Sequence, residues 1–272
     1  MQARQRNNVR EMGQSAATMV FSHGYGCDQN MWRFLAPRYA ERYRVVLFDL
    51  VGSGMSDLSA YDRNKYATLQ GHADDLLEIL EECAAGPVVF VGHSVSAMIG
   101  MLADLKSPGR FAAHLMIAPS PCYVTDGNYN GGFSRDDIDS LLETLESNFL
   151  GWSSNMAPAI MGAPEQPELA VELTNSFCRT DPDIAQHFAR VTFLSDNRAD
   201  LGRLHTPTLI VQCSEDLIAP LAVGAYMQAH IPGSVLRVID NIGHCPHLSA
   251  PGACADAMDE FLSGVPKQAH GS

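Results

Sequence analysis

The 272-residue chain has no cluster of basic side chains and no apolar segment long enough to span a membrane. Its formal net charge is −13, which argues against a nucleic-acid partner because the phosphates would be repelled. Its first residues lack the apolar run of a secretory signal peptide. We therefore expect a protein that has neither a nucleic-acid nor a membrane partner.

The chain contains cysteines, but no two of them have the short spacing of a metal-binding or redox motif. The seven cysteines lie singly, and none stands with histidines at the spacing of a zinc finger. Such unpaired cysteines indicate reduced thiols, so we expect a cytoplasmic protein. The glycine-rich segment 51–57 lacks the spacing of a dinucleotide loop because Asp57 falls where the third glycine belongs. We expect neither a metal nor a cofactor.

What the sequence does contain is an alternation of apolar runs with helical patterns. Hydrophobic residues make up 46% of the chain, enough for the core of one large domain. The alternation predicts an α/β fold with a mostly parallel sheet flanked by helices. The runs that predict buried strands stand at about 19–24, 43–50, 88–92, 114–119, 208–213 and 234–239.

The alternation stops after the fourth of these strands. Residues 133–194 carry helical patterns only, at about 134–149, 153–161, 168–178 and 181–194. Ser134 and Asp137 have the spacing of a capping box at the start of the first helix. We therefore expect 1–132 and 195–272 to form the sheet domain, and 133–194 to form an inserted four-helix lid over a pocket.

The most informative stretch is 88–100. A run of β-branched and aromatic residues turns abruptly at Gly92-His93-Ser94 and continues as a helical pattern of small and apolar residues. A serine at such a turn is a nucleophile elbow, and the helix N-terminus beside it suits an oxyanion. The usual G-x-S-x-G motif has a glycine where Ser96 stands, and we expect the turn to tolerate this small residue. The alternative is an ordinary strand-to-helix turn capped by serine.

Two later strand ends supply partners for Ser94. Asp216 and His244 each follow a predicted strand, so all three side chains reach the same edge of the sheet. The chain order of nucleophile, acid and histidine is that of α/β hydrolases, in which histidine takes the serine proton and the acid orients the histidine. Glu215 is the rival acid, and His247 is the rival base. We favour Asp216 because it lies further beyond the strand, and His244 because the preceding glycine frees its loop.

The dipeptide at 23–24 follows the first predicted strand, where this fold class supplies its second oxyanion donor. We expect the backbone N–H groups of Tyr25 and Val95 to form the oxyanion hole, with His23 orienting the loop. The alternative is a plain connecting loop. The side chains that we expect to line the pocket are His23, Tyr25, Phe133, Leu141, Trp152, Met156, Phe193, Ile218 and Cys245.

These motifs give the chain a specific resemblance, carried by residues 23–29, 91–100, 119–121, 131–133 and 243–249. The sequence resembles the family that joins the bacterial stress-pathway hydrolase RsbQ to the plant strigolactone and karrikin receptors. The resemblance implies a triad at Ser94, His244 and Asp216, and a V-shaped four-helix lid over a deep, largely apolar pocket. Ser96 is similar to the receptor branch, whereas Cys27, the segment 51–54 and Cys245-Pro246 are similar to the RsbQ branch, in which we place the chain.

Two functions remain open at this point. The first is a serine hydrolase that cleaves an ester, lactone or enol-ether-type bond in a small apolar molecule. The second is a ligand-responsive signalling protein that turns over slowly and passes a change in the lid to a partner. The resemblance to RsbQ implies a PAS-domain phosphatase as that partner. A dehalogenase or epoxide hydrolase is disfavoured, because those enzymes place aspartate where Ser94 stands.

Overall fold

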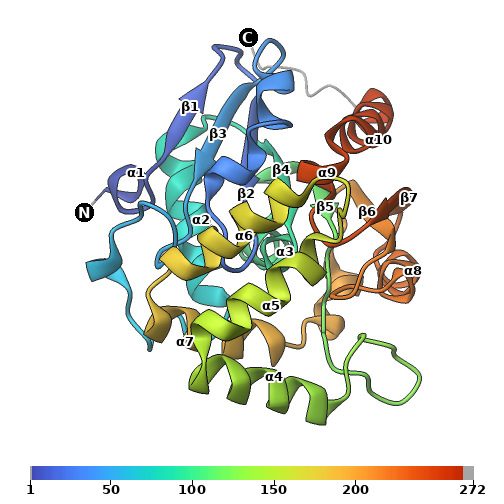
Figure 1. Ribbon diagram of the computed structural model, residues 1–272. Coiled ribbons are helices and arrows are strands. Elements are labelled where there is room, and N and C mark those ends of the chain that lie inside the picture. Colours follow the sequence, from blue (N-terminus) through green and yellow to red (C-terminus); the bar gives the residue numbers. More distant parts are fainter. Residues whose placement is uncertain (1, 266–272) are drawn as a thin grey trace.

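The computed structural model describes residues 2–265, which form one seven-stranded sheet with helices on both faces (Figure 1). The strand order is β1-β3-β2-β4-β5-β6-β7, and every neighbouring pair is parallel except β1 with β3. This topology confirms the predicted mostly parallel sheet. The strands are β1 Arg10–Met12, β2 Thr18–Ser22, β3 Arg44–Phe48, β4 Val88–His93, β5 Phe111–Ile117, β6 Thr208–Glu215 and β7 Val235–Ile242.

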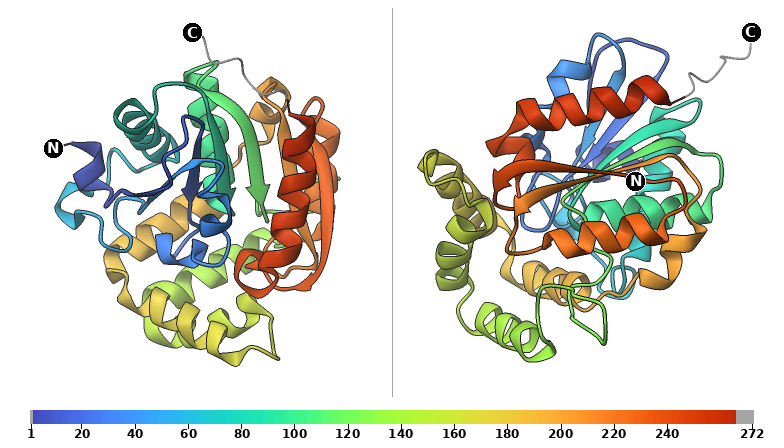
Figure 2. Two further views of the ribbon diagram at one scale, coloured as in Figure 1. Left: turned by 90° about the horizontal axis from the view of Figure 1, so that it is seen from above. Right: turned by 90° about the vertical axis from the view of Figure 1, so that its right-hand side faces the viewer.

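Helices cover both faces of the sheet (Figure 2), and an apolar cluster fills the space between helices and strands on each face. On one face, α2 (Gln70–Cys83), α3 (Val95–Lys106) and α8 (Leu221–His230) bury side chains against the strands. On the other face, α10 (Pro251–Gly264) packs beside two 3₁₀ segments, Gln29–Trp32 and Ala36–Tyr39. The remaining short helices are α1 Ala3–Arg6, α9 Pro246–Ser249 and the 3₁₀ turns Leu58–Ala60 and Arg198–Arg203.

Between β5 and β6 the chain forms a helical insertion, which lies along one side of the sheet (Figures 1 and 2). Ser134 and Asp137 form the expected capping box at its start. The second helix begins four residues earlier than we predicted, because the Asn148 side chain accepts from the Gly151 N–H at 3.0 Å and caps it. The helices of the insertion are α4 Arg135–Ser147, α5 Phe149–Met161, α6 Pro167–Arg179 and α7 Pro182–Phe193.

Strand β1 was not among the strands that we predicted. Its residues, Arg-Glu-Met, form no apolar run, and the strand is only three residues long. It pairs antiparallel with β3 at the edge of the sheet, where Arg44 of β3 binds both carboxylate oxygens of Glu11 at 2.8–2.9 Å. The strand is thus specified by pairing and charge rather than by hydrophobicity.

All seven cysteines are free thiols, as the unpaired spacing predicted, and six of them are buried. Within residues 2–265, no helix has both the length and the apolar character that crossing a lipid bilayer requires.

His72 on α2 is a buried histidine that packs like an apolar aromatic ring. It is 1% exposed, and its ring centroid lies 4.5 Å from that of Tyr66 and 4.8 Å from that of Phe188. Within the described part of the chain, neither ring nitrogen has a hydrogen-bond partner. Burial lowers the pKa of His72 to about 3, so the ring is neutral in the folded protein.

This histidine should make the protein less stable in mild acid. The unfolded chain takes up the proton near pH 6.5, whereas the folded chain resists it down to about pH 3, so stability falls as the pH drops below 6.5. At about pH 5 the loss from His72 is roughly 2 kcal/mol. We expect the free energy of unfolding by urea to decrease from pH 7.5 to pH 5, and to decrease less in His72→Gln than in the wild type. Equal losses in both proteins would contradict this account.

Candidate active site

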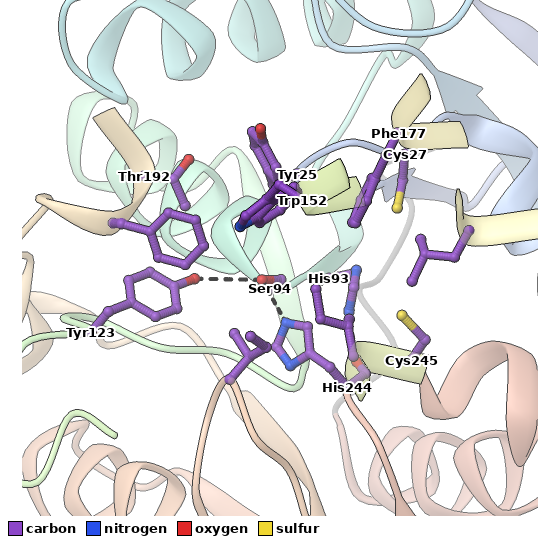
Figure 3. A pocket seen from close by; sticks show the side chains of 14 residues that line it. Tyr25, Cys27, His93, Ser94, Tyr123, Trp152, Phe177, Thr192, His244 and Cys245 are labelled. Atoms are coloured by element: carbon purple, nitrogen blue, oxygen red, sulfur yellow. Dashed lines mark hydrogen bonds between the residues drawn. The ribbon is translucent and has the colours of Figure 1, made fainter. Parts of the chain in front are cut away.

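Ser94, His244 and Asp216 form one chain of hydrogen bonds at the carboxyl edge of the sheet. Figure 3 shows the bond between Ser94 and His244 beside the cavity. The Nδ1–H of His244 donates to Oδ2 of Asp216 at 2.7 Å, because a carboxylate can only accept. This fixes the tautomer, so Nε2 of His244 accepts from the Ser94 hydroxyl at 2.8 Å. All three side chains are buried, which removes competing water from the bonds.

The backbone that follows β6 holds the Asp216 carboxylate in place. Its other oxygen, Oδ1, accepts from the N–H groups of Ile218 and Ala219 at 2.8 and 3.1 Å. The rival acid, Glu215, is exposed to solvent, and its carbonyl oxygen accepts from the N–H of Gly243 at 2.8 Å. Glu215 therefore supports the loop of His244 through its backbone, while Asp216 contacts the imidazole.

The second rival, His247, lies behind this chain of bonds. Its ring is fully buried, 4.6 Å from the Trp32 ring and 4.4 Å from the His93 ring. Burial and the nearby His244 lower the pKa of His247 to about 3. His247 thus packs as a neutral ring and is not hydrogen-bonded to Ser94.

Ser94 occupies a sharp turn between β4 and α3. Its φ of 55° is positive, a conformation that costs a non-glycine residue energy and occurs at functional turns. The turn depends on Gly92, because a Cβ there would lie 2.8 Å from the backbone of Ser96 and Ala97. A single glycine therefore provides the close approach of helix to strand that this turn needs.

The serine that replaces the second glycine of the motif has its own contacts. Ser96 is fully buried, and its hydroxyl donates to the carbonyl oxygen of His23 at 2.5 Å. Since that proton is committed, the Ser22 hydroxyl donates to Ser96 Oγ at 2.8 Å. Ser96 thus joins the elbow to the loop that carries Tyr25.

The loop after β2 runs directly beside Ser94. A Cβ at Gly24 would lie 2.5 Å from Nδ1 of His93 and 3.3 Å from the Cβ of Ser94, so only glycine fits there without a shift of the His93 ring. The N–H of Val95 has no acceptor within α3 because Val95 is the first residue of that helix, and Tyr25 N–H has no backbone acceptor among residues 2–265. Both groups that we expected to form the oxyanion hole are therefore next to the Ser94 turn and free to donate.

The side chain of His23 orients this loop through two hydrogen bonds. Its Nε2 accepts from the N–H of Leu50 at 3.0 Å, so Nδ1–H donates to the carbonyl oxygen of Gly24 at 2.8 Å. With both nitrogens bonded and the ring fully buried, His23 does not reach the cavity, contrary to our assignment of it to the pocket.

A narrow, mostly apolar cavity opens above Ser94 (Figure 3). The sheet domain contributes Tyr25, Cys27, His93, Tyr123, Ile218 and Cys245 around Ser94 and His244. The insertion contributes Trp152, Ile160, Leu173, Phe177, Thr192 and Phe193. The free volume is about 30 Å³, the space of one or two water molecules, so this state is closed to larger ligands.

Of the nine residues that we expected to line this cavity, five do so: Tyr25, Trp152, Phe193, Ile218 and Cys245. Besides His23, three from the insertion do not. Phe133 is held by backbone bonds to residues 123 and 125, while Leu141 and Met156 pack, partly buried, on the apolar core. Tyr123 was missed, although its hydroxyl lies 3.4 Å from Ser94 Oγ. It stands in an irregular loop, where no periodic pattern marks a residue as facing a cavity.

The fold and this arrangement at the elbow define a class of protein. The sequence profile of the alpha/beta hydrolase family matches residues 19–257. The chain belongs to that family, and it is an enzyme of the serine-hydrolase type.

Individual relatives agree with this assignment. A hydrolase from Oleispira antarctica, known from its solved structure, is 41% identical, with 96% of each chain covered and a TM-score of 0.92. A strigolactone esterase of Pisum sativum is 38% identical over 258 residues, covering 94% of this chain and 96% of the relative. A karrikin insensitive 2 receptor of Petunia hybrida is 37% identical over 246 residues, covering 90% and 91%. The resemblance to the plant receptors that the motifs indicated is thereby confirmed.

The contacts of Ser96 lead to a test on stability. Ser96→Ala leaves the buried carbonyl of His23 without its donor, which should cost about 1–3 kcal/mol in the free energy of unfolding by urea. Ser22→Ala is the matched control, because it removes a buried hydroxyl but leaves the bond from Ser96 to His23. We expect the control to lose less. A larger loss in Ser22→Ala would show that the bond to His23 is not the important one.

Proposed function

We propose that the protein is a serine esterase that cleaves a small, largely apolar ester, lactone or enol-ether-type substrate. Ser94 is the nucleophile, His244 the general base and Asp216 the acid that orients the histidine. The observation that carries the proposal is the chain of bonds at 2.8 and 2.7 Å, which ends at a serine hydroxyl facing an apolar cavity.

The geometry supports a two-step reaction. His244 Nε2 takes the Ser94 proton as Oγ attacks the substrate carbonyl, and Asp216 stabilises the imidazolium that forms. The N–H groups of Tyr25 and Val95 stabilise the oxyanion. His244 then protonates the leaving group, and a water molecule, activated by the same nitrogen, releases the acyl group from Ser94.

The lining of the cavity favours an uncharged substrate. Besides the triad and His93, the residues around it are aromatic, aliphatic, cysteine or threonine, with no Lys, Arg, Asp or Glu. Burying a charged group there without a partner would be costly. The Tyr123 hydroxyl lies 3.4 Å from Ser94 Oγ, and burial raises its pKa to about 12, so it stays protonated and can donate.

We further propose that residues 133–194 act as a lid. The closed cavity holds about 30 Å³, so an ester-sized ligand requires the insertion to shift. The insertion is hydrogen-bonded to the loop that carries Gly24, Tyr25 and Gly26, which we call the oxyanion loop. The Tyr25 hydroxyl donates to the carbonyl of Ala185 at 3.1 Å, and the Ser176 hydroxyl donates to the carbonyl of Gly26 at 2.8 Å. Movement of the lid therefore reaches the groups that would stabilise the transition state.

A second candidate is a ligand-responsive signalling protein that uses the same triad slowly and offers a partner the changed lid surface. The contact that favours it lies at the end of α5, where the carbonyl of Ile160 accepts from the N–H of His244 at 2.7 Å. A relative named as a karrikin insensitive 2 receptor supports it. Steady turnover of simple esters would favour the enzyme, whereas a burst followed by stalling and ligand-dependent melting would favour the receptor.

Substitutions of the acid test the triad directly. Asp216→Asn should lower kcat for a chromogenic ester by about 10³- to 10⁴-fold with a smaller change in KM, because an amide no longer stabilises the required tautomer and the imidazolium. Glu215→Gln is the matched control, one residue away and exposed, and should change kcat little.

Ser94→Ala gives the lowest activity expected in the assay. It should hydrolyse the ester only at the residual rate that substrate binding and oxyanion stabilisation provide without a nucleophile. Near wild-type activity in Ser94→Ala would exclude this nucleophile. A larger effect of Glu215→Gln than of Asp216→Asn would mean that the acid is misassigned.

The lid should respond to a ligand in solution. An apolar ester or lactone should slow hydrogen exchange in peptides from 133–194 and leave those from β4 and β5 nearly unchanged, because the ligand packs against the insertion. Ser94→Ala should show the same protection, since binding precedes the chemical step. The measurement is peptide-resolved exchange with and without ligand, with binding confirmed separately. Unchanged lid peptides despite confirmed binding would favour a rigid pocket.

A further inference from the structure

Three buried residues with metal-binding atoms meet beside the triad: His93, Cys245 and His247. One ligand atom from each lies within 4.8 Å of the other two, and this is the one such group of three or more among residues 2–265. The exposed fractions of the residues are 2%, 1% and 0%. The mechanism above uses none of these side chains.

Three ring nitrogens of the two histidines in this group have no hydrogen-bond partner among the described residues. His93 Nε2–H donates to the carbonyl oxygen of His244 at 2.9 Å, because a carbonyl can only accept, so Nδ1 carries a lone pair. That Nδ1 and both nitrogens of His247 have no hydrogen-bond partner within the described residues. A histidine whose second nitrogen donates to a backbone carbonyl is in the form that metal-ligating histidines usually take.

The donor set fits a borderline cation. Two imidazole nitrogens and one thiolate are typical ligands of Zn²⁺, and carboxylates, which Ca²⁺ and Mg²⁺ prefer, are absent from the group. Bonds of about 2.0 Å to nitrogen and 2.3 Å to sulfur place ligand atoms of one ion roughly 3.3–3.6 Å apart. The three atoms, now up to 4.8 Å apart, have to approach one another by about 1 Å to bind one ion.

We propose that His93, Cys245 and His247 form a binding site for Zn²⁺ or a similar thiophilic cation, and that the bound ion slows the triad. His93 and Cys245 line the cavity, through which an ion reaches the group (Figure 3). Binding replaces the S–H bond of Cys245 by a metal–sulfur bond and releases the proton to solvent.

The link to the triad runs through the backbone of His244. Cys245 follows it in the chain, and His93 holds its carbonyl oxygen. An ion that draws His93 and Cys245 together therefore shifts the peptide on which the imidazole of His244 is carried. This consequence, unlike the binding itself, rests on the proposed role of His244 as general base.

Binding is tested with Co²⁺, which occupies zinc sites and gives a thiolate-to-cobalt charge-transfer band. Titration of the full-length protein should produce this band with saturation at one equivalent, and added Zn²⁺ should abolish it. Cys245→Ser should lose the band. His247→Gln should lose or weaken it, which keeps the test informative if one variant folds poorly. Cys27→Ser is the matched control, a buried cysteine on the same cavity but outside the group, and should keep the band.

The absence of a thiolate band in the wild type, or its persistence in Cys245→Ser, would overturn the site. Ester hydrolysis with and without Zn²⁺ then tests the inhibition, which we expect in the wild type and in Cys27→Ser but not in Cys245→Ser. Binding without slower hydrolysis would overturn the inhibitory role. A protein without any esterase activity would contradict the proposed function instead, since the band does not depend on turnover.

Discussion

The hydrogen bond from the His244 N–H to the carbonyl oxygen of Ile160, 2.7 Å long, joins the sheet domain to the insertion at the residue that contacts Ser94. The two segments approach so closely that side chains cannot fit between them. A Cβ at Gly243 would lie 1.9 Å from the carbonyl oxygen of Met161, and one at Gly162 would lie 2.7 Å from the Cα of Gly243. The position of the imidazole therefore depends on the end of α5 as much as on the strand that precedes it.

The oxyanion loop is attached to the insertion in the same way, through Tyr25 to α7 and through Gly26 to α6. The imidazole of His244 and the loop of Tyr25, which approach Ser94 from the sheet domain, are thus both hydrogen-bonded to helices of the insertion, which we propose to act as a lid. The described conformation has an assembled triad with little free volume beside it, and a lid that opened would break these bonds. If the insertion acts as the proposed lid, this one constraint relates the two functions that we weigh, because opening the lid would disturb the groups that are proposed to carry out turnover.

The sequence was sufficient for those parts of the molecule that local patterns determine. Apolar runs located the buried strands, and the turn at Ser94 with two later strand ends placed the proposed triad. It was insufficient where a position depends on distant partners. Strand β1 exists because Glu11 and Met12 pair with β3, and Tyr123 faces Ser94 because a loop folds back over the sheet. Leu141 and Met156 are apolar in the sequence, but only the packing of the insertion decides that they face the core.

The buried histidines show why distant partners matter most for polar side chains. An unpartnered buried nitrogen costs about 1–3 kcal/mol, so each one calls for a physical reason. For His72 the reason is aromatic packing, since its ring stacks on Tyr66 and contacts Phe188. His247 likewise contacts Trp32, but it also faces a second imidazole and a thiol across 4.8 Å or less. Packing accounts for the ring of His247, and the proximity of its nitrogen to those of His93 and to the thiol of Cys245 is what supports the proposed cation site.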